Sequence, residues 1–137
     1  GSMVALTATS ANYTNGTSTI SVDPSGFIIW TPTSINTTAS AANTTVQIRP
    51  VRLNPLTFNY AANQALRGGM SAMVDVTSSN TAVGTITISP AVFSANTLLV
   101  NTAFDPNMAG TSTISVITPA GWDTSTNLTQ ITATVAP

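Results

Sequence analysis

A string of seven residues occurs twice without change in this chain, and it limits what the chain can fold into. Gly-Thr-Ser-Thr-Ile-Ser-Val stands at residues 16–22 and again at residues 110–116, 94 residues later. Each copy is followed by Pro, one small residue, Gly and an aromatic residue, at residues 24–27 and 119–122. One small β-sandwich domain needs about 100 residues, close to this period. The sequence therefore predicts the end of one module followed by one complete module.

Alternation of apolar and polar residues marks short strands along the chain. The two clearest runs are residues 72–77 and 130–135, where every second residue is apolar. A period of two is typical of a strand with one buried and one solvated face. Thr, which is favoured on pleated surfaces, is the most frequent residue. Further strands are expected at residues 3–9, 17–22, 27–31, 45–53, 56–60, 85–89, 97–103 and 111–118.

Turn-forming residues separate these runs at short intervals. Asn-Gly at residues 15–16, Asp-Pro-Ser-Gly at 23–26, Asn-Pro at 54–55 and Asp-Pro-Asn at 105–107 are examples. Gly adopts positive φ, Pro fixes φ, and Asn or Asp bonds to the local backbone, so each favours a reversal of the chain. The spacing predicts an all-β protein, an immunoglobulin-like β-sandwich of the antiparallel Greek-key type.

Very few side chains carry charge, and this excludes several functions. There are three cations, four anions and no His or Cys in 137 residues. A Cys nucleophile, a His base, the usual His/Cys metal sites and a disulfide framework are therefore excluded. No basic surface for nucleic acid or an anionic membrane is present either. We expect no enzymatic activity, no catalytic or metal-binding residues and no cofactor.

Two groups of residues resemble a known family. They are the stretch from Gly84 to Phe93, and the strand at residues 110–116 with its Pro-x-Gly-aromatic turn. Both are similar to the tandem immunoglobulin-like modules of large bacterial surface or secreted proteins. The resemblance covers residues 47–137, with residues 10–46 as a partial second copy. It implies an extracellular or cell-surface location and a role as spacer or display module, such as an adhesin stalk. Calcium at module junctions would require acidic clusters, which this chain does not provide.

The acidic residues allow two site hypotheses. Asp105 and Asp123 would have to meet for paired-carboxylate chemistry, as in glycoside hydrolysis, but each also fits a turn or capping role. The four Asp, which include Asp23 and Asp75, could instead share a calcium ion, although they lack the Asp-x-Asp-x-Asp spacing. We expect turn and surface roles for all four.

The arginines and aromatic residues offer two binding hypotheses. Arg49, Arg52 and Arg67 could form a patch for an anionic sugar or a partner carboxylate, or make separate surface pairs, for instance with Asp75. Flat aromatic rings could stack on sugars, but Phe27 and Trp122 occupy matching positions in the repeat, which favours packing at the module end. The other aromatic residues considered for stacking are Trp30, Tyr13 and Tyr60.

The chain is expected to divide at residue 46. Residues 1–46 would be the C-terminal part of a preceding module or an N-terminal extension packed on the sandwich, and residues 47–137 a complete module. Gly1, Ser2 and Met3 are expected to be a cloning remnant on a piece of a longer protein. Lys is absent, so strand edges would be protected by Pro24, Pro50, Pro55 and Pro90 or covered by another module or chain.

The leading functional interpretation is a structural spacer or display module. Its expected partners are neighbouring modules of the same parent chain. The alternatives are a glycan- or protein-binding adhesion module and a self-associating filament or array subunit. Clustered, exposed aromatic and Arg side chains would favour binding, and scattered ones would favour a spacer. The sequence assigns no ligand-binding residue.

Overall fold

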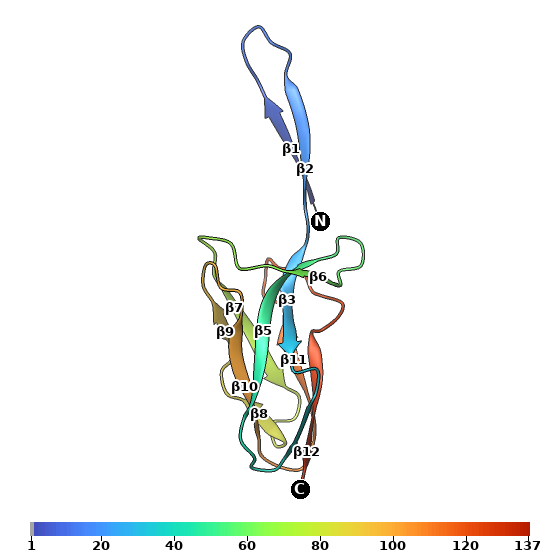
Figure 1. Cartoon of the computed structure of the whole chain (residues 1–137), viewed down its shortest axis with the longest axis vertical. Helices are drawn as coiled ribbons and strands as arrows, with labels where there is room; N and C mark the ends of the chain where they lie inside the picture. Colours follow the sequence, from blue (N-terminus) through green and yellow to red (C-terminus); the bar gives the residue numbers. More distant parts are fainter. Residues whose placement is uncertain (1) are drawn as a thin grey trace.

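The computed structural model describes residues 2–137, which form a two-sheet body and one hairpin that projects from it (Figure 1). Gly1, part of the expected cloning remnant, lies outside the described residues. The hairpin consists of β1 (Ser2–Ala8) and β2 (Gly16–Val22). The described residues contain no helix, and therefore none that could span a membrane. The predicted all-β class is confirmed.

The body contains ten strands in two five-stranded sheets. Sheet 1 has the order β3 (Ser25–Thr31), β5 (Thr44–Leu53), β10 (Val100–Pro106) and β8 (Gly84–Ile86), and β6 (Tyr60–Asn63) also pairs with β5. Sheet 2 has the order β4 (Ile35–Thr38), β12 (Gln130–Ala136), β11 (Gly110–Ile117), β7 (Ala72–Ser78) and β9 (Ala91–Phe93).

One apolar core lies between the two sheets. Sheet 1 contributes Phe27, Ile48 and Phe104, and sheet 2 contributes Phe93 and Ile114, all of them fully buried. The inward residues come from alternate positions, as the period of two predicts. A smaller cluster of Ile28, Val51 and Leu53 lies apart from this core, with Phe58 and Tyr60 packed against it.

Strand direction departs from the prediction at one edge. All other pairs are antiparallel, but β4 runs parallel to β12, with Ile35 opposite Ala133. The connection from β3 to β4 crosses from sheet 1 to sheet 2 at residues 32–34, which include Pro32. The predicted antiparallel sheets are therefore confirmed except at this edge.

Most of the expected strands are confirmed, but of the strand expected at residues 56–60 only Tyr60 is in a strand, as the first residue of β6, and residues 56–59 form a loop. The side-chain oxygen of Asn54 accepts hydrogen bonds from the backbone N–H groups of Leu56 at 2.9 Å and Thr57 at 3.0 Å. Phe58 has a φ of 59° and donates its N–H to the Asn54 carbonyl at 2.8 Å. These local bonds compete with strand pairing, as Asn side chains do in turns. The short strands β4, β6 and β9 were not predicted.

Buried hydroxyl groups in the body form hydrogen bonds with uncharged partners. Ser112, which is 3% exposed, contacts Ser78 Oγ at 2.8 Å and accepts from the backbone N–H of Asn80 at 3.0 Å. Thr102, also 3% exposed, donates to the carbonyl of Ile88 at 2.8 Å. Within residues 2–137, no buried side-chain nitrogen or oxygen lacks a partner. The few Ser and Thr side chains that are buried are therefore compatible with stability.

The strand pairing differs from the expected division at residue 46. That boundary falls inside β5, and both β3 and β4 belong to the sheets that residues 47–137 complete. The structure separates the hairpin of residues 2–22 from the body of residues 24–137 (Figure 1). The reason is that Phe27, Ile29 and Ile35 fill the core shared by both sheets.

Candidate functional site

The hairpin leaves one apolar face without cover. In the register of β1 and β2, Val4 lies opposite Ile20, Leu6 opposite Ser18, and Ser2 opposite Val22. Directly opposite residues share a face, so the four apolar side chains form one surface. We call Val4, Leu6, Ile20 and Val22 the apolar face; they are 46%, 48%, 49% and 48% exposed. The other face of the hairpin carries Met3, Ala5, Thr7, Thr17, Thr19 and Ser21.

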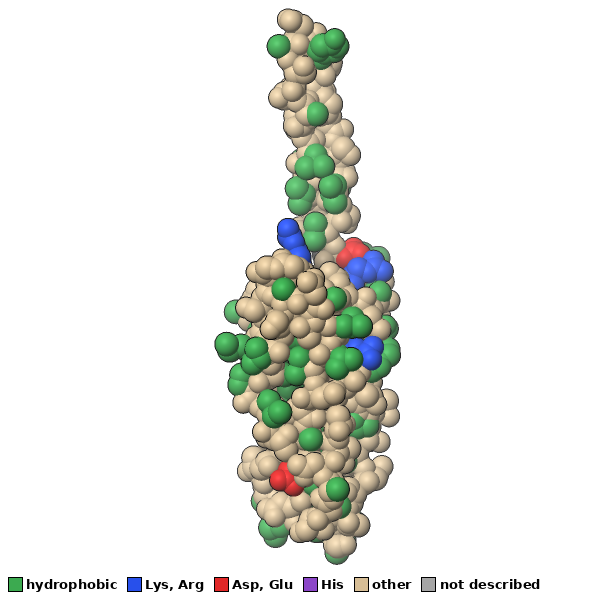
Figure 2. Space-filling model, turned by 60° about the vertical axis from the view of Figure 1, so that its left-hand side comes forward, with side chains coloured by type: hydrophobic (Ala, Val, Ile, Leu, Met, Phe, Trp, Pro, Cys, Tyr) green, Lys and Arg blue, Asp and Glu red, His purple; other side chains and the backbone are tan. Residues whose placement is uncertain are grey.

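The surface of the hairpin is uncharged. Residues 2–22 contain no Asp, Glu, Lys or Arg, and Figure 2 shows hydrophobic side chains along the projecting hairpin and charged ones on the body. An isolated two-stranded hairpin is only marginally stable in water, and uncharged, unpaired strand edges are templates for association. The hairpin is therefore the first candidate for a functional surface.

The same seven residues occupy opposite environments in β2 and β11. In β11, Ser112, Ile114 and Val116 are buried, and the strand lies between β12 and β7. In β2, every residue is exposed and only β1 pairs with the strand. The sequence signal was present, because the alternation that buries one face of β11 is repeated in β2. This alternation predicted a buried face on residues 16–22, but in the hairpin that face is exposed.

The two copies of the Pro-x-Gly-aromatic turn meet at the hairpin end of the body. The rings of Phe27 and Trp122 lie 4.7 Å apart between centroids, which confirms their expected role in packing. A Cβ at Gly26 would collide with the carbonyl oxygen of Asp123, whose N–H donates to the Ser25 carbonyl at 2.9 Å. Glycine is therefore required at position 26 for the close approach of these two segments.

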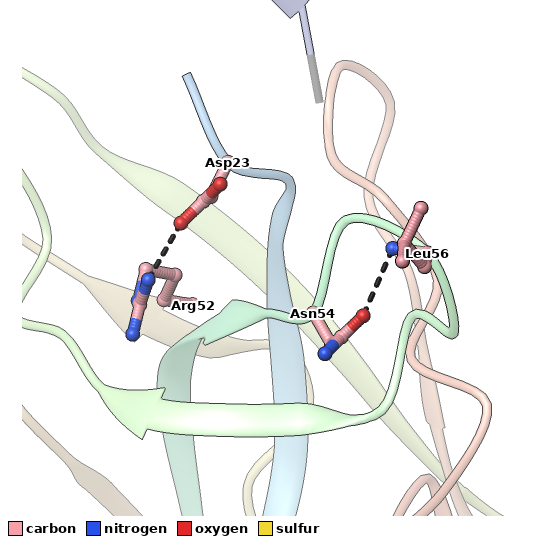
Figure 3. A network of polar contacts seen from close by, with 4 residues as sticks. All are labelled: Asp23, Arg52, Asn54 and Leu56. Carbon is pink, nitrogen blue, oxygen red and sulfur yellow. Dashed lines mark hydrogen bonds and ion pairs between the residues drawn. The ribbon is translucent and has the colours of Figure 1, made fainter. Parts of the chain in front are cut away.

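An open hollow of about 360 Å³ lies at the base of the hairpin. It is lined by Ser2, Val22, Asp23, Pro24, Ser25 and Asp123. Beside it, Arg52 Nη1 and Asp23 Oδ2 form an ion pair at 2.6 Å, near the Asn54–Leu56 turn (Figure 3). Arg52 is exposed and its side chain has water available, so this pair adds little stability. A second hollow of about 240 Å³ adjoins it and includes Arg67, Gln64, Met70 and Trp122.

The four Asp do not form a single site. Asp23 and Asp123 line the same hollow, whereas Asp105 lies opposite Thr85 in β8 and Asp75 lies opposite Ile117 in β11. Asp105 and Asp123 are therefore on different elements and are not brought together as a catalytic pair. No group of three or more acidic residues that could hold a metal ion occurs among residues 2–137.

The three Arg are also separate. Arg52 pairs with Asp23 and not with Asp75, and Arg67 lines the second hollow. Arg49 places its guanidinium 4.6 Å from the centre of the Trp30 ring and donates from Nε to Gln47 Oε1 at 2.9 Å. A joint patch of all three is not formed.

Part of the aromatic set does cluster. The Trp30 and Tyr60 rings lie 5.6 Å apart, and Arg49 stacks on Trp30, so these three side chains form one group, the Trp30 cluster. Trp30 is 36% exposed. Tyr13 lies away from this group, in the loop that connects β1 to β2, and is 78% exposed. Contacts of this kind stabilise the fold and can also present a ring edge to a ligand.

Comparisons with known proteins identify the fold at low sequence identity. No family model and no curated protein matches the chain. Among solved structures, the chain is similar to domains 4 and 5 of the S-layer protein SbsC, with a TM-score of 0.54 and 13% sequence identity. The match covers 90% of this chain and 59% of that chain. The chain therefore spans about three fifths of the structure it matches and shares its fold.

Proposed function

We propose that the chain is a structural module of a cell-surface or extracellular protein, where it serves as a spacer or display unit. The observation that carries the proposal is the fold that the chain shares with domains 4 and 5 of the S-layer protein SbsC, at a TM-score of 0.54. The body is a two-sheet unit with its own apolar core. Units of this kind can be joined in series with mainly nearest-neighbour contacts, which suits a spacer.

Strand order supports an immunoglobulin-like assignment for the body. In a constant-type domain, strands A, B, E and D form one sheet and C, F and G the other. Taking β3, β5, β7, β8, β10, β11 and β12 as strands A to G gives sheet 1 the order A-B-E-D and sheet 2 the order G-F-C. The remaining body strands, β4, β6 and β9, are short additions of three or four residues. Similarity to S-layer protein domains supports the surface location by analogy of fold.

Labelling of intact cells tests this function. We expect antibodies raised against the body to label intact cells of the source organism or material released from them. The matched control is permeabilised cells, in which labelling by the body antibody should not increase substantially. An antibody to a cytoplasmic protein, which labels only after permeabilisation, shows that the intact cells are sealed. Labelling by the body antibody only after permeabilisation would contradict the proposal.

The Trp30 cluster favours a second candidate function, the binding of a glycan. It combines an aromatic platform with the guanidinium of Arg49 and the nearby amides of Gln47 and Asn101, which contact each other at 3.4 Å. Aromatic rings beside hydrogen-bonding groups are suited to sugar rings. If the chain binds a glycan on an array, Trp30→Ala should reduce that binding at least about tenfold, the effect of losing about 1.4 kcal/mol. Tyr13→Ala, which removes an exposed ring in the hairpin loop, is the control. Equal loss in both variants, or none in Trp30→Ala, would reject this site.

A further inference from the structure

We propose that two copies of the chain associate through their hairpins, with the apolar face of one packed against the apolar face of the other. The proposal goes beyond the structural role described above and stands independently of it. It explains why Val4, Leu6, Ile20 and Val22 share one face of a projecting, uncharged hairpin and are all about half exposed.

The pair of strands β11 and β12 shows what such a face packs against. There Ile114 lies opposite Ile131 and Ser112 opposite Ala133, just as Ile20 lies opposite Val4 and Ser18 opposite Leu6 in the hairpin. In the body this face is buried against sheet 1. The hairpin thus has the composition and register of one layer of a two-layer structure, and its second layer must be an apolar sheet face.

The body of a second copy offers no uncovered face of this kind on β11 and β12. Their outward positions include Thr113, Ser115, Thr132 and Thr134, and their inward positions already form the core. On β7 and β9, the exposed Met73 and Val92 share their surface with Asp75, which would lose water on docking. The hairpin of a second copy provides an apolar strand pair without charges. It therefore matches the apolar face better than sheet 2 of a second copy does.

Shape and charge allow this contact. The hairpin extends away from the body, so two hairpins can overlap with their bodies at opposite ends (Figure 1). No like charges would meet, because residues 2–22 contain no Asp, Glu, Lys, Arg or His. The contact is symmetric and closes with two copies, which predicts a dimer and not a filament.

The area of the contact is small. Strands of seven residues are only about 23 Å long, so the surface that each hairpin buries is smaller than the roughly 800 Å² per partner of a standard interface. Association should therefore be weak and dependent on concentration.

Light scattering over a wide concentration range tests the proposal on the full chain. The mass should rise from 14.0 kDa toward twice that value as the concentration increases. The double variant Val4→Thr/Ile20→Thr should remain at the monomer mass at concentrations where the parent chain is at least half dimeric. Thr keeps the β-branched shape that strands favour, so the hairpin should persist while its face becomes polar.

The matched control for this variant lies on the other face. Met3→Thr introduces the same residue type in β1 at a position opposite Ser21, away from the apolar face. It should dimerise as the parent chain does. Met73→Thr, on the outward side of β7, should also leave the mass curve unchanged.

Chemical crosslinking tests which faces meet. The chain has no Cys, so Ser18→Cys and Ser21→Cys each introduce a single thiol into β2, the first on the side of the apolar face and the second on the opposite face. Packed sheets lie about 10 Å apart, which exceeds the reach of a direct disulfide, so the reagent is a bis-maleimide of matching span. Ser18→Cys should form crosslinked dimers at least about tenfold faster than Ser21→Cys, a difference of about 1.4 kcal/mol in activation free energy.

Three results would overturn the proposal. A parent chain that stays at 14.0 kDa up to millimolar concentration has no hairpin association. Equal association of the parent and the Val4→Thr/Ile20→Thr variant, or loss of association in Met73→Thr alone, would place the contact elsewhere. Equal crosslinking at positions 18 and 21 would show that no one face is specific. None of these results bears on surface labelling, so the two proposals can fail separately.

Discussion

A chain truncated to residues 24–137 is expected to fold, whereas one truncated to residues 43–137 is expected to remain unfolded. The longer piece loses the hairpin, whose strands make their extensive contacts with each other, and Asp23 with its exposed ion pair to Arg52. The shorter piece also loses β3 and β4, and with them Phe27, Ile28, Ile29 and Ile35, each at most 2% exposed. Burial of one such side chain contributes about 1.5–3 kcal/mol. The loss of four approaches the about 5–15 kcal/mol of an entire domain.

Urea unfolding and the dispersion of amide NMR signals measure this difference. The piece of residues 24–137 should show dispersed signals and a free energy of unfolding within about 1 kcal/mol of the full chain, the range of a change that removes no core contact. The piece of residues 43–137 should show collapsed dispersion and no cooperative transition. A cooperatively folded piece of residues 43–137 would contradict the structure and support a module that begins near residue 47.

Phe27→Ala is expected to destabilise the body by about 3–5 kcal/mol, the cost of removing a buried phenyl ring and leaving a cavity. Phe27 is fully buried, and its ring lies 5.1 Å from that of Phe93 and 4.7 Å from that of Trp122. It therefore joins the two sheets to the turn at the hairpin end. The effect is a large fraction of the total stability of a domain of this size.

Urea unfolding measures the stability of this variant. The urea midpoint should fall, while the slope of the free energy of unfolding against urea concentration should match that of the parent chain. The matched control is Leu56→Ala, because Leu56 is 89% exposed in the loop before β6, and it should cost less than about 0.5 kcal/mol. Similar destabilisation by both substitutions would show that the ring of Phe27 does not lie in the core between the two sheets.

Local patterns predicted much of the fold because they act over a few residues. Alternation found β7 and β12 with boundaries accurate to about one residue at most ends. The repeated turn predicted that Phe27 and Trp122 act in packing, and they contact each other. The failures have local causes that the patterns do not weigh, such as the Asn54 side chain, whose hydrogen bonds hold residues 56–59 in a loop.

The candidate surfaces were less predictable because they depend on contacts distant in sequence. Trp30, Arg49 and Tyr60 come from β3, β5 and β6, and no spacing in the sequence links them. Likewise, the positions of the four Asp in the sequence do not show that Asp23 and Asp123 line one hollow while Asp75 and Asp105 lie apart from it. Such groupings follow from sheet order, which is set by the packing of the whole core.

The sequence by itself determined the β class, most of the turns and which side of each strand is apolar. Only the tertiary structure decided that residues 110–116 form a central strand while the identical residues 16–22 form half of an exposed hairpin. The physical reason is that strand preference and alternation belong to the local chain, whereas burial requires a second apolar layer. For β11 that layer is sheet 1, whereas within residues 2–137 no second layer covers β2.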